Sequence, residues 1–125
     1  MKKKLSNREV GIWGEDAAAA MIQQQGWMVI GRNIRTPYGE IDLIGQLGNM
    51  VVFFEVKTRS SKAYGQPEEA ITRGKSAHMV NAALSYMHEH QELSEDWRID
   101  VISIEVKAGE EGYSMEWFEN AVTSS

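Results

Sequence analysis

Two apolar, strand-like runs joined by Gly48-Asn49 constrain the fold of this chain more than any other feature. The first run spans residues 41–44 and the second spans residues 50–57. Glycine followed by asparagine between two such runs is typical of a two-residue type II′ hairpin turn. A two-residue turn also fixes which residues lie opposite each other. The sequence therefore predicts an antiparallel hairpin of defined register, which a longer loop or a bulge would shift.

Charged residues interrupt both runs. In the predicted register Asp42 lies opposite Glu55, and Glu40 lies opposite Lys57. Because side chains alternate between the two faces of a strand, all four project from one face of the hairpin. Charged groups in such apolar strands are costly to bury unless something pairs with them. We therefore expect either a metal site built from carboxylates or a satisfied ion-pair network that includes a Glu40–Lys57 salt bridge.

The metal interpretation gives each of these residues a chemical role. Carboxylate oxygens suit Mg²⁺ or Mn²⁺, and two protein carboxylates leave positions for waters and a phosphate oxygen. We expect Asp42 and Glu55 to hold the cation. Lys57, two residues after Glu55, would hold the attacking water or stabilise developing negative charge. Such a site can hydrolyse a phosphodiester bond.

Glu15 is a further candidate ligand. It lies on a predicted helix that is capped by Ser6 or Asn7 and runs to about Gln25, with Gly26 as its stop. Its neighbours at helical spacing are small or apolar, namely Gly11, Ala18, Ala19 and Ile22. Glu15 either completes the metal site or is an acid near a helix N-terminus, where it interacts favourably with the helix dipole.

The rest of the chain predicts an α/β fold. Further strands are expected at residues 27–33, 97–106 and 113–118, and a helix is expected at about 72–90. The apolar stripe of that helix is predicted to be Ala77, Val80, Leu84 and Met87, with Ala83 beside it. A strand, a helix and a strand in succession favour a parallel crossover connection.

We expect a central mixed five-stranded sheet flanked by helices, in one domain that spans residues 1–125. Tails at about 1–6 and 120–125 are expected to fray. The chain has no cysteine, which excludes disulfides, thiolate zinc sites and thiol nucleophiles. There is neither a secretory signal pattern nor an apolar run of membrane-spanning length, so we expect a cytoplasmic protein.

The charge is unevenly distributed along the chain. The formal net charge is −5, which by itself argues against a nucleic-acid partner. Residues 32–75, however, hold seven Lys or Arg against five Asp or Glu, whereas residues 76–125 hold two against ten. Because the local field steers a polyanion more than the total charge does, the basic residues near the candidate site are candidates for nucleic-acid contacts. These candidates are Arg59, Lys62, Arg73 and Lys75.

Several motifs occur in order between about residues 7 and 104. They are Gly14-Glu15, Gly26, Arg32-Asn33, Gly39-Glu40-Ile41-Asp42-Leu43-Ile44, Phe54-Glu55-Val56-Lys57-Thr58-Arg59, Tyr64-Gly65-Gln66-Pro67-Glu68-Glu69-Ala70, Lys75 and Arg98-Ile99-Asp100-Val101. In these motifs the chain resembles the YraN-like bacterial family (uncharacterised protein family 0102). That family is grouped with Holliday-junction resolvases in the restriction-endonuclease-like superfamily.

The resemblance implies a restriction-endonuclease-like core and metal-dependent cleavage of DNA, with branched or structured DNA as a candidate substrate. Asp42 matches the first acid of the nuclease pattern, Glu55 and Lys57 match its Glu-X-Lys, and Glu15 matches the helix-borne acid of the resolvase branch. Glu40 matches the family motif without a predicted metal role. Resolvase-like relatives act as dimers, which implies a homodimer. The alternatives are a non-catalytic nucleic-acid-binding module of the same fold, or a structural or interaction protein with an ion-paired sheet face.

Overall fold

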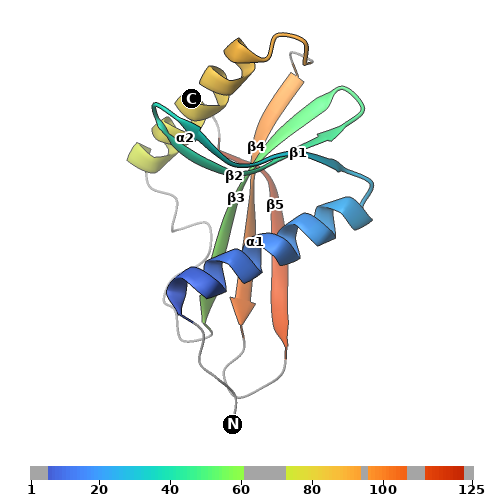
Figure 1. The fold of residues 1–125 in the computed structure, drawn as a ribbon, viewed down its shortest axis with the longest axis vertical. Helices are drawn as coiled ribbons and strands as arrows, with labels where there is room; N and C mark the ends of the chain where they lie inside the picture. Colours follow the sequence, from blue (N-terminus) through green and yellow to red (C-terminus); the bar gives the residue numbers. More distant parts are fainter. Residues whose placement is uncertain (1–5, 61–72, 94–95, 107–111, 123–125) are drawn as a thin grey trace.

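The structure, a computed structural model, describes residues 6–60, 73–93, 96–106 and 112–122. Within these residues two helices flank one sheet, and the elements are α1 (Asn7–Gln24), β1 (Met28–Thr36), β2 (Gly39–Leu47), β3 (Met50–Ser60), α2 (Arg73–Glu89), β4 (Asp96–Val106) and β5 (Tyr113–Val122). The five strands lie in the order β1-β2-β3-β4-β5 (Figure 1). Among these five described strands, only β3 and β4 pair in parallel. The predicted α/β fold with a mixed five-stranded sheet is confirmed.

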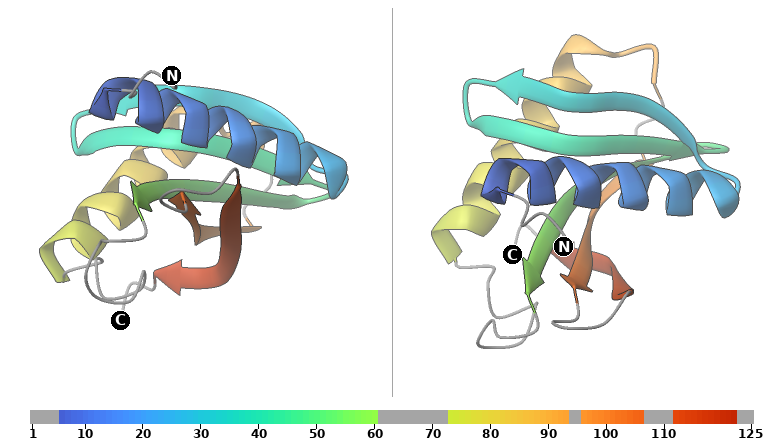
Figure 2. Two further views of the ribbon diagram at one scale, coloured as in Figure 1. Left: turned by 90° about the horizontal axis from the view of Figure 1, so that it is seen from below. Right: turned by 60° about the horizontal axis from the view of Figure 1, so that its bottom comes forward.

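The two helices cover opposite faces of the sheet (Figure 2). The buried side chains between α1 and the sheet are Ala18, Ala19, Ile22, Leu43, Val52, Phe54, Ile102 and Ile104. Those between α2 and the sheet are Ile41, Ile44, Val51, Phe53, Ala82, Ala83, Tyr86, Ile99 and Val122. Successive residues of β3 thus enter different clusters, as the alternation of a strand buried on both faces requires.

The register of the β2–β3 hairpin agrees with the prediction. Ile44 pairs with Phe53, and Leu47 pairs with Met50 directly before and after the turn. Gly48 has a φ of +58°, while Asn49 is not among the residues with positive φ, which is the pattern that a type II′ turn requires. The regular pairing continues to the pair of Leu43 and Phe54 and ends there.

Helix α1 begins and ends as its sequence predicts. Ser6 and Glu9 form a capping box, and Gly26, with a φ of +96°, follows the last turn. In the middle of the helix Gly14 lies directly against β3, so close that a Cβ atom there would overlap the side chain of Thr58. A glycine therefore permits the contact that brings the residue after it, Glu15, close to β3.

Replacing Gly14 by alanine is expected to destabilise the protein by about 1–3 kcal/mol, the usual cost of overpacking. The added methyl group would overlap Thr58, so α1 has to move away from β3. Gly11→Ala is the matched control on the same helix. Outside that helix's own backbone, no atom of the described residues lies within 4 Å of the methyl group that it adds. Urea denaturation of the two variants measures the difference.

The control variant should match the wild type or exceed it by up to about 1 kcal/mol, because alanine has the higher helix propensity. Equal stability of Gly14→Ala and Gly11→Ala would contradict the assigned contact.

Two predictions about the second half of the chain are wrong in part. In the predicted apolar stripe of α2, Val80, Met87 and Ala83 do pack against the core, but Ala77 and Leu84 are exposed. Their places on the packed face are taken by Ala82 and Tyr86. Residues 120–122 were expected to fray but belong to β5, where Val122 is buried and pairs with Ile99. In both segments burial against the sheet outweighs the local pattern.

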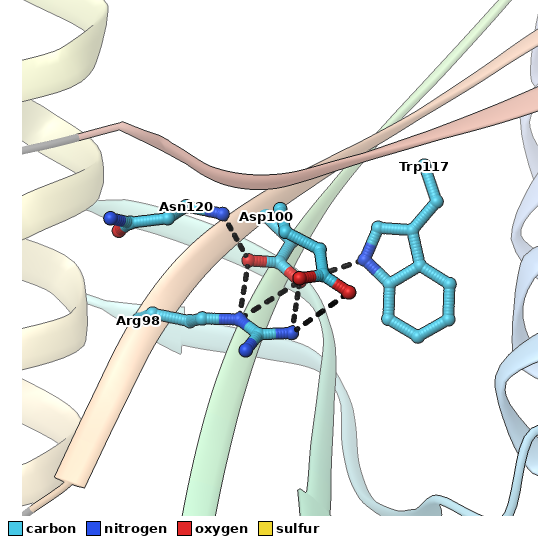
Figure 3. Close-up of polar contacts among 5 residues, drawn as sticks. Arg98, Asp100, Trp117 and Asn120 are labelled. Carbon is cyan, nitrogen blue, oxygen red and sulfur yellow. Dashed lines mark hydrogen bonds and ion pairs between the residues drawn. The ribbon is translucent and has the colours of Figure 1, made fainter.

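Asp100 is a fully buried acid of β4 whose hydrogen bonds link β5 to β4. Its carboxylate accepts hydrogen bonds from Arg98 Nε at 3.0 Å, Trp117 Nε1 at 2.7 Å and the Asn120 backbone N–H at 2.8 Å. Figure 3 shows these three residues gathered around the carboxylate. The β4–β5 register shifts between Ile99 and Val101, so Asp100 lies at the irregularity and supplies the bonds that regular pairing does not.

Asp100→Asn is expected to lower the free energy of unfolding by about 3–5 kcal/mol, because it leaves the Arg98 guanidinium without its buried partner. Thermal and urea unfolding measure the loss. Glu116→Gln, which neutralises an exposed acid on β5, should change stability by less than about 0.5 kcal/mol. If both variants unfold at the same denaturant concentration, the buried network does not stabilise the sheet.

Candidate active site

The candidate site lies where β2 leaves β3. One residue beyond the last regular pair, the Asp42 carboxylate accepts a hydrogen bond of 2.9 Å from the backbone N–H of Val56. The side chain thus takes the place of a β2 carbonyl oxygen as the partner of that N–H. Because the acceptor of a strand N–H lies near the plane of the sheet, the Asp42 carboxyl group is placed between the two faces.

In β2, the alternation of side chains between the two faces of the sheet is interrupted at the same point. Ile41 and Ile44 pack in the same cluster beneath α2, although strict alternation would place residues three apart on opposite faces. The prediction that Glu40, Asp42, Glu55 and Lys57 share one face assumed that alternation continues through Asp42. Instead, an opening forms where β2 separates from β3 at Asp42. The charged side chains of Glu55, from β3, and Glu15, from α1, approach Asp42 from the two sides of this opening.

Glu55 and Lys57 come from β3. Lys57 Nζ lies 2.9 Å from Glu55 Oε1, so the lysine is paired with the acid two residues before it. The ion-pair interpretation had Glu40 opposite Lys57, but Glu40 lies beyond the last regular pair of the hairpin and is exposed. The Lys57 side chain is 25% exposed, so this ion pair is only partly buried.

Among the acids that the structure describes, Asp42 has the most strongly shifted pKa. The pKa of Asp42 is raised to about 7, chiefly by burial and then by the charge of the neighbouring Glu55, while the Val56 hydrogen bond acts to lower it. A hydrogen bond between the carboxyl groups of Asp42 and Glu55 and the charge of Glu15 also act to raise this pKa. Glu55 and Glu15 therefore lie close enough to Asp42 for their charges to disfavour its ionisation.

Glu15 reaches this group from α1. Burial raises the pKa of Glu15, while a hydrogen bond from Asn33 and the charge of Arg32 oppose that shift. Arg32 Nε lies 3.9 Å from Glu15 Oε1, and the same guanidinium binds Asp16. The helix-dipole interpretation of Glu15 does not account for these contacts, which direct the side chain towards the sheet rather than the helix end.

Asn33 is a member of the site to which the sequence analysis gave no role. Its φ of +53° lies in the left-handed region, which asparagine tolerates better than most residues. This unusual conformation within β1 accompanies the hydrogen bond of its side chain to Glu15. The motif Arg32-Asn33 was the available signal, since an asparagine in a strand often marks a special backbone conformation.

The candidate nucleic-acid contacts are described only in part. Arg59 lies on β3 two residues beyond Lys57, is half-buried and already has an interaction partner. Arg73 and Lys75 fall in the first turn of α2, but their side chains are outside the described part, and Lys62 is outside it altogether. The structure therefore brings Glu15, Asp42, Glu55 and Lys57 together and leaves the four basic residues as predictions.

The donor set fits a hard divalent cation held in part by solvent. Among the side chains that the structure describes, no three His, Cys, Asp or Glu residues are grouped closely enough to hold a metal by themselves. Asp42 and Glu55 nevertheless offer paired carboxylate oxygens whose mutual repulsion a cation would relieve. Mg²⁺ typically binds to one or two carboxylates and keeps its remaining positions for water and phosphate.

The fold and the site define an α/β protein whose mixed sheet brings three acids and a lysine together where two strands part. Residues 14–104 match the family described as uncharacterised protein family UPF0102, and the chain belongs to that family. A UPF0102 protein of Syntrophomonas wolfei is 41% identical over 103 residues, which cover 82% of this chain and 90% of that protein. One of Shewanella loihica is 40% identical over 111 residues, covering 89% and 91%.

Among solved structures, the chain is similar to a repair endonuclease from Pyrococcus abyssi. The TM-score is 0.41 and the sequence identity is 17%, over 86% of this chain and 39% of that one. The chain thus spans well under half the length of that endonuclease. Neither helix in the described residues is long and apolar enough to cross a membrane.

The Asp42→Asn variant is expected to be more stable than the wild type at about pH 8 and equally stable near pH 4. The pKa of Asp42 is raised from 3.8 to about 7, so the folded protein binds more protons than the unfolded chain in this window. Wild-type stability therefore falls as the pH rises through it, by up to about 4 kcal/mol from this group. Asparagine removes the charge and keeps an oxygen for the Val56 N–H.

Urea denaturation of both proteins between about pH 4 and pH 8 measures this gap. Asp16→Asn, at an exposed acid on α1, is the control and should show a much smaller dependence on pH. If the difference in the free energy of unfolding between Asp42→Asn and the wild type stays constant with pH, the assigned environment of Asp42 is contradicted.

Proposed function

We propose that this protein is a metal-dependent endonuclease that hydrolyses phosphodiester bonds in DNA. The observation that carries the proposal is the meeting of Glu15, Asp42 and Glu55 with Lys57 at the opening between β2 and β3. The four residues come from α1, β2 and β3, so the fold itself assembles them. The order of the acids and the Glu-X-Lys spacing are also those by which the sequence resembles nucleases.

Asp42 and Glu55 are the proposed ligands of Mg²⁺ or Mn²⁺. When bound, the cation supplies polarisation of the phosphate, a lowered pKa of bound water and compensation of charge on the leaving oxygen. Asp42 is held in place by the Val56 N–H, and Glu55 is held by Lys57. Both carboxylates are therefore oriented before a substrate arrives, which favours catalysis by preorganisation.

Lys57 and Glu15 are the proposed assisting groups. The Lys57 side chain is partly exposed, and its ammonium group, paired with Glu55, would hold the attacking water or stabilise negative charge on the phosphate. Glu15 would act as a further ligand or orient a bound water, in a position fixed by Asn33 and Arg32. The family resemblance supports branched or structured DNA as the substrate and a homodimer as the acting form.

The Lys57–Glu55 and Arg32–Asp16 ion pairs favour one rival function. They are what a structural or interaction protein with an ion-paired sheet face would show. Such a protein needs neither metal nor DNA, whereas a non-catalytic nucleic-acid-binding module would bind DNA in a salt-dependent way without cutting it.

The purified protein is expected to nick DNA when Mn²⁺ or Mg²⁺ is present and to leave it intact in EDTA. The assay compares linear, nicked and four-way-junction DNA. Asp42→Ala, Glu55→Ala and Lys57→Ala should each lower the cleavage rate by at least about 100-fold, because each removes a group that binds the metal or the developing charge. Circular dichroism of each variant checks that the fold is retained.

Glu15→Gln and Asp16→Asn form a matched pair on α1. Both neutralise an acid that interacts with Arg32, but only Glu15 acts electrostatically on Asp42. We expect cleavage to fall in the first variant and to stay within about twofold in the second. Intact DNA under every condition would refute the proposed activity, and full activity of Asp42→Ala would refute the proposed site.

A further inference from the structure

A cavity of about 170 Å³ lies beside the candidate site, between β2, β3 and α2. Its walls are mainly apolar, and they include Ile41, Phe53, Met79, Ala82 and Ile99. An apolar cavity of about 150 Å³ is large enough to hold a benzene molecule. The present cavity therefore has room for one six-membered aromatic ring.

The cavity adjoins the proposed catalytic centre through Glu55. This residue lines the cavity, binds Lys57 and raises the pKa of Asp42 by its charge. Whatever occupies the cavity therefore lies against one proposed ligand of the cation, Glu55, whose charge acts on the other, Asp42. Such a position suits a group covalently attached to the substrate rather than an unrelated ligand.

The polar part of the lining limits the chemistry of the occupant. Glu40 and Glu55 contribute acidic groups, and no Lys or Arg is among the described residues that line the cavity. A phosphate group is therefore disfavoured by charge, while a neutral group with N–H donors is favoured. Tyr38 and His78, both well exposed, add aromatic rings to the lining, against which a flat ring can stack.

We propose that this cavity binds an unpaired pyrimidine base of the DNA strand, and prefers cytosine to thymine. The ring enters the apolar cavity, and the exocyclic amino group of cytosine donates to a carboxylate of the lining, where thymine presents an acceptor oxygen. A base inside a duplex would first have to be unpaired and unstacked, so bulged or branched DNA binds better. The proposal rests on the proposed function, because it places DNA at this site.

Fluorescence anisotropy tests the proposal without requiring cleavage. The probes are three labelled duplexes, with a single bulged cytosine, with a single bulged thymine, and fully paired, in Ca²⁺ and at low salt. We expect the cytosine bulge to bind about tenfold more tightly than the paired duplex, and the thymine bulge to lie between them. Gel electrophoresis of the same samples verifies that the DNA is intact.

Two variant pairs locate the binding. Ala82→Leu fills the cavity, and Ala77→Leu places the same side chain at an exposed position of α2 that does not line it. His78→Ala removes an aromatic ring from the lining, and His88→Ala removes one from an exposed position further along the helix. The bulge preference is the ratio of the affinities for the cytosine-bulge duplex and the paired duplex. We expect Ala82→Leu to lower this ratio to less than about two. We expect His78→Ala to lower it about fivefold, as loss of one stacking contact does. Neither control variant should change it.

Equal binding of the three duplexes by the wild type would overturn the proposal. So would a wild-type preference that persists in His78→Ala, whose exposed position leaves the fold intact, even if Ala82→Leu fails to fold. The cleavage assay in Mn²⁺ is read separately. Tighter binding of bulged DNA that depends on His78, without any cleavage, would refute the nuclease function and support the base-binding cavity. Cleavage without tighter binding of bulged DNA would support the nuclease function and refute the base-binding cavity.

Discussion

The hydrogen bond between the Val56 N–H and the Asp42 carboxylate is the interaction on which the candidate site depends. A strand that separates from its neighbour exposes backbone groups, and a buried N–H without a partner is costly. Asp42 satisfies this donor with its side chain, so β2 can leave β3 without that cost. The same bond holds the carboxylate between the two faces of the sheet, where Glu55 approaches from β3 and Glu15 from α1.

Two of the acids that the structure describes as buried or half-buried, Asp100 and Asp42, have surroundings that differ in kind. Asp100 is surrounded by donors from Arg98, Trp117 and Asn120, and its role is to join β4 to β5. Asp42 has one backbone donor and two acids as neighbours. An acid surrounded by donors stabilises a structure, whereas acids gathered together cost stability and gain from a bound cation. This contrast is why the Asp42 group, and not Asp100, is the candidate functional site.

Local features of the sequence were sufficient to predict the hairpin register and the bounds of α1. The Gly48-Asn49 turn and the alternation of β3 defined the hairpin register, and the Ser6 cap and Gly26 stop bounded α1. Other features depend on contacts between distant residues. The break in alternation at Asp42 follows from the separation of two strands, and the hydrogen bond of Asn33 to Glu15 joins β1 to α1. Leu84 was misassigned because the buried face of α2 is set by the sheet beneath it.

The strand order has a consequence for the way this chain reaches its native state. Asp42 and Glu55 lie in a hairpin closed by a two-residue turn, and such a hairpin forms within about 1–10 μs. The parallel partner of β3 comes much later in the chain, since Met50 pairs with Asp96. Closing that long connection is slow, because its entropy is lost before the contacts form. The candidate site therefore combines local hairpin contacts next to Asp42 and Glu55 with a parallel pairing of large sequence separation, and the second kind of contact is the slower one to form.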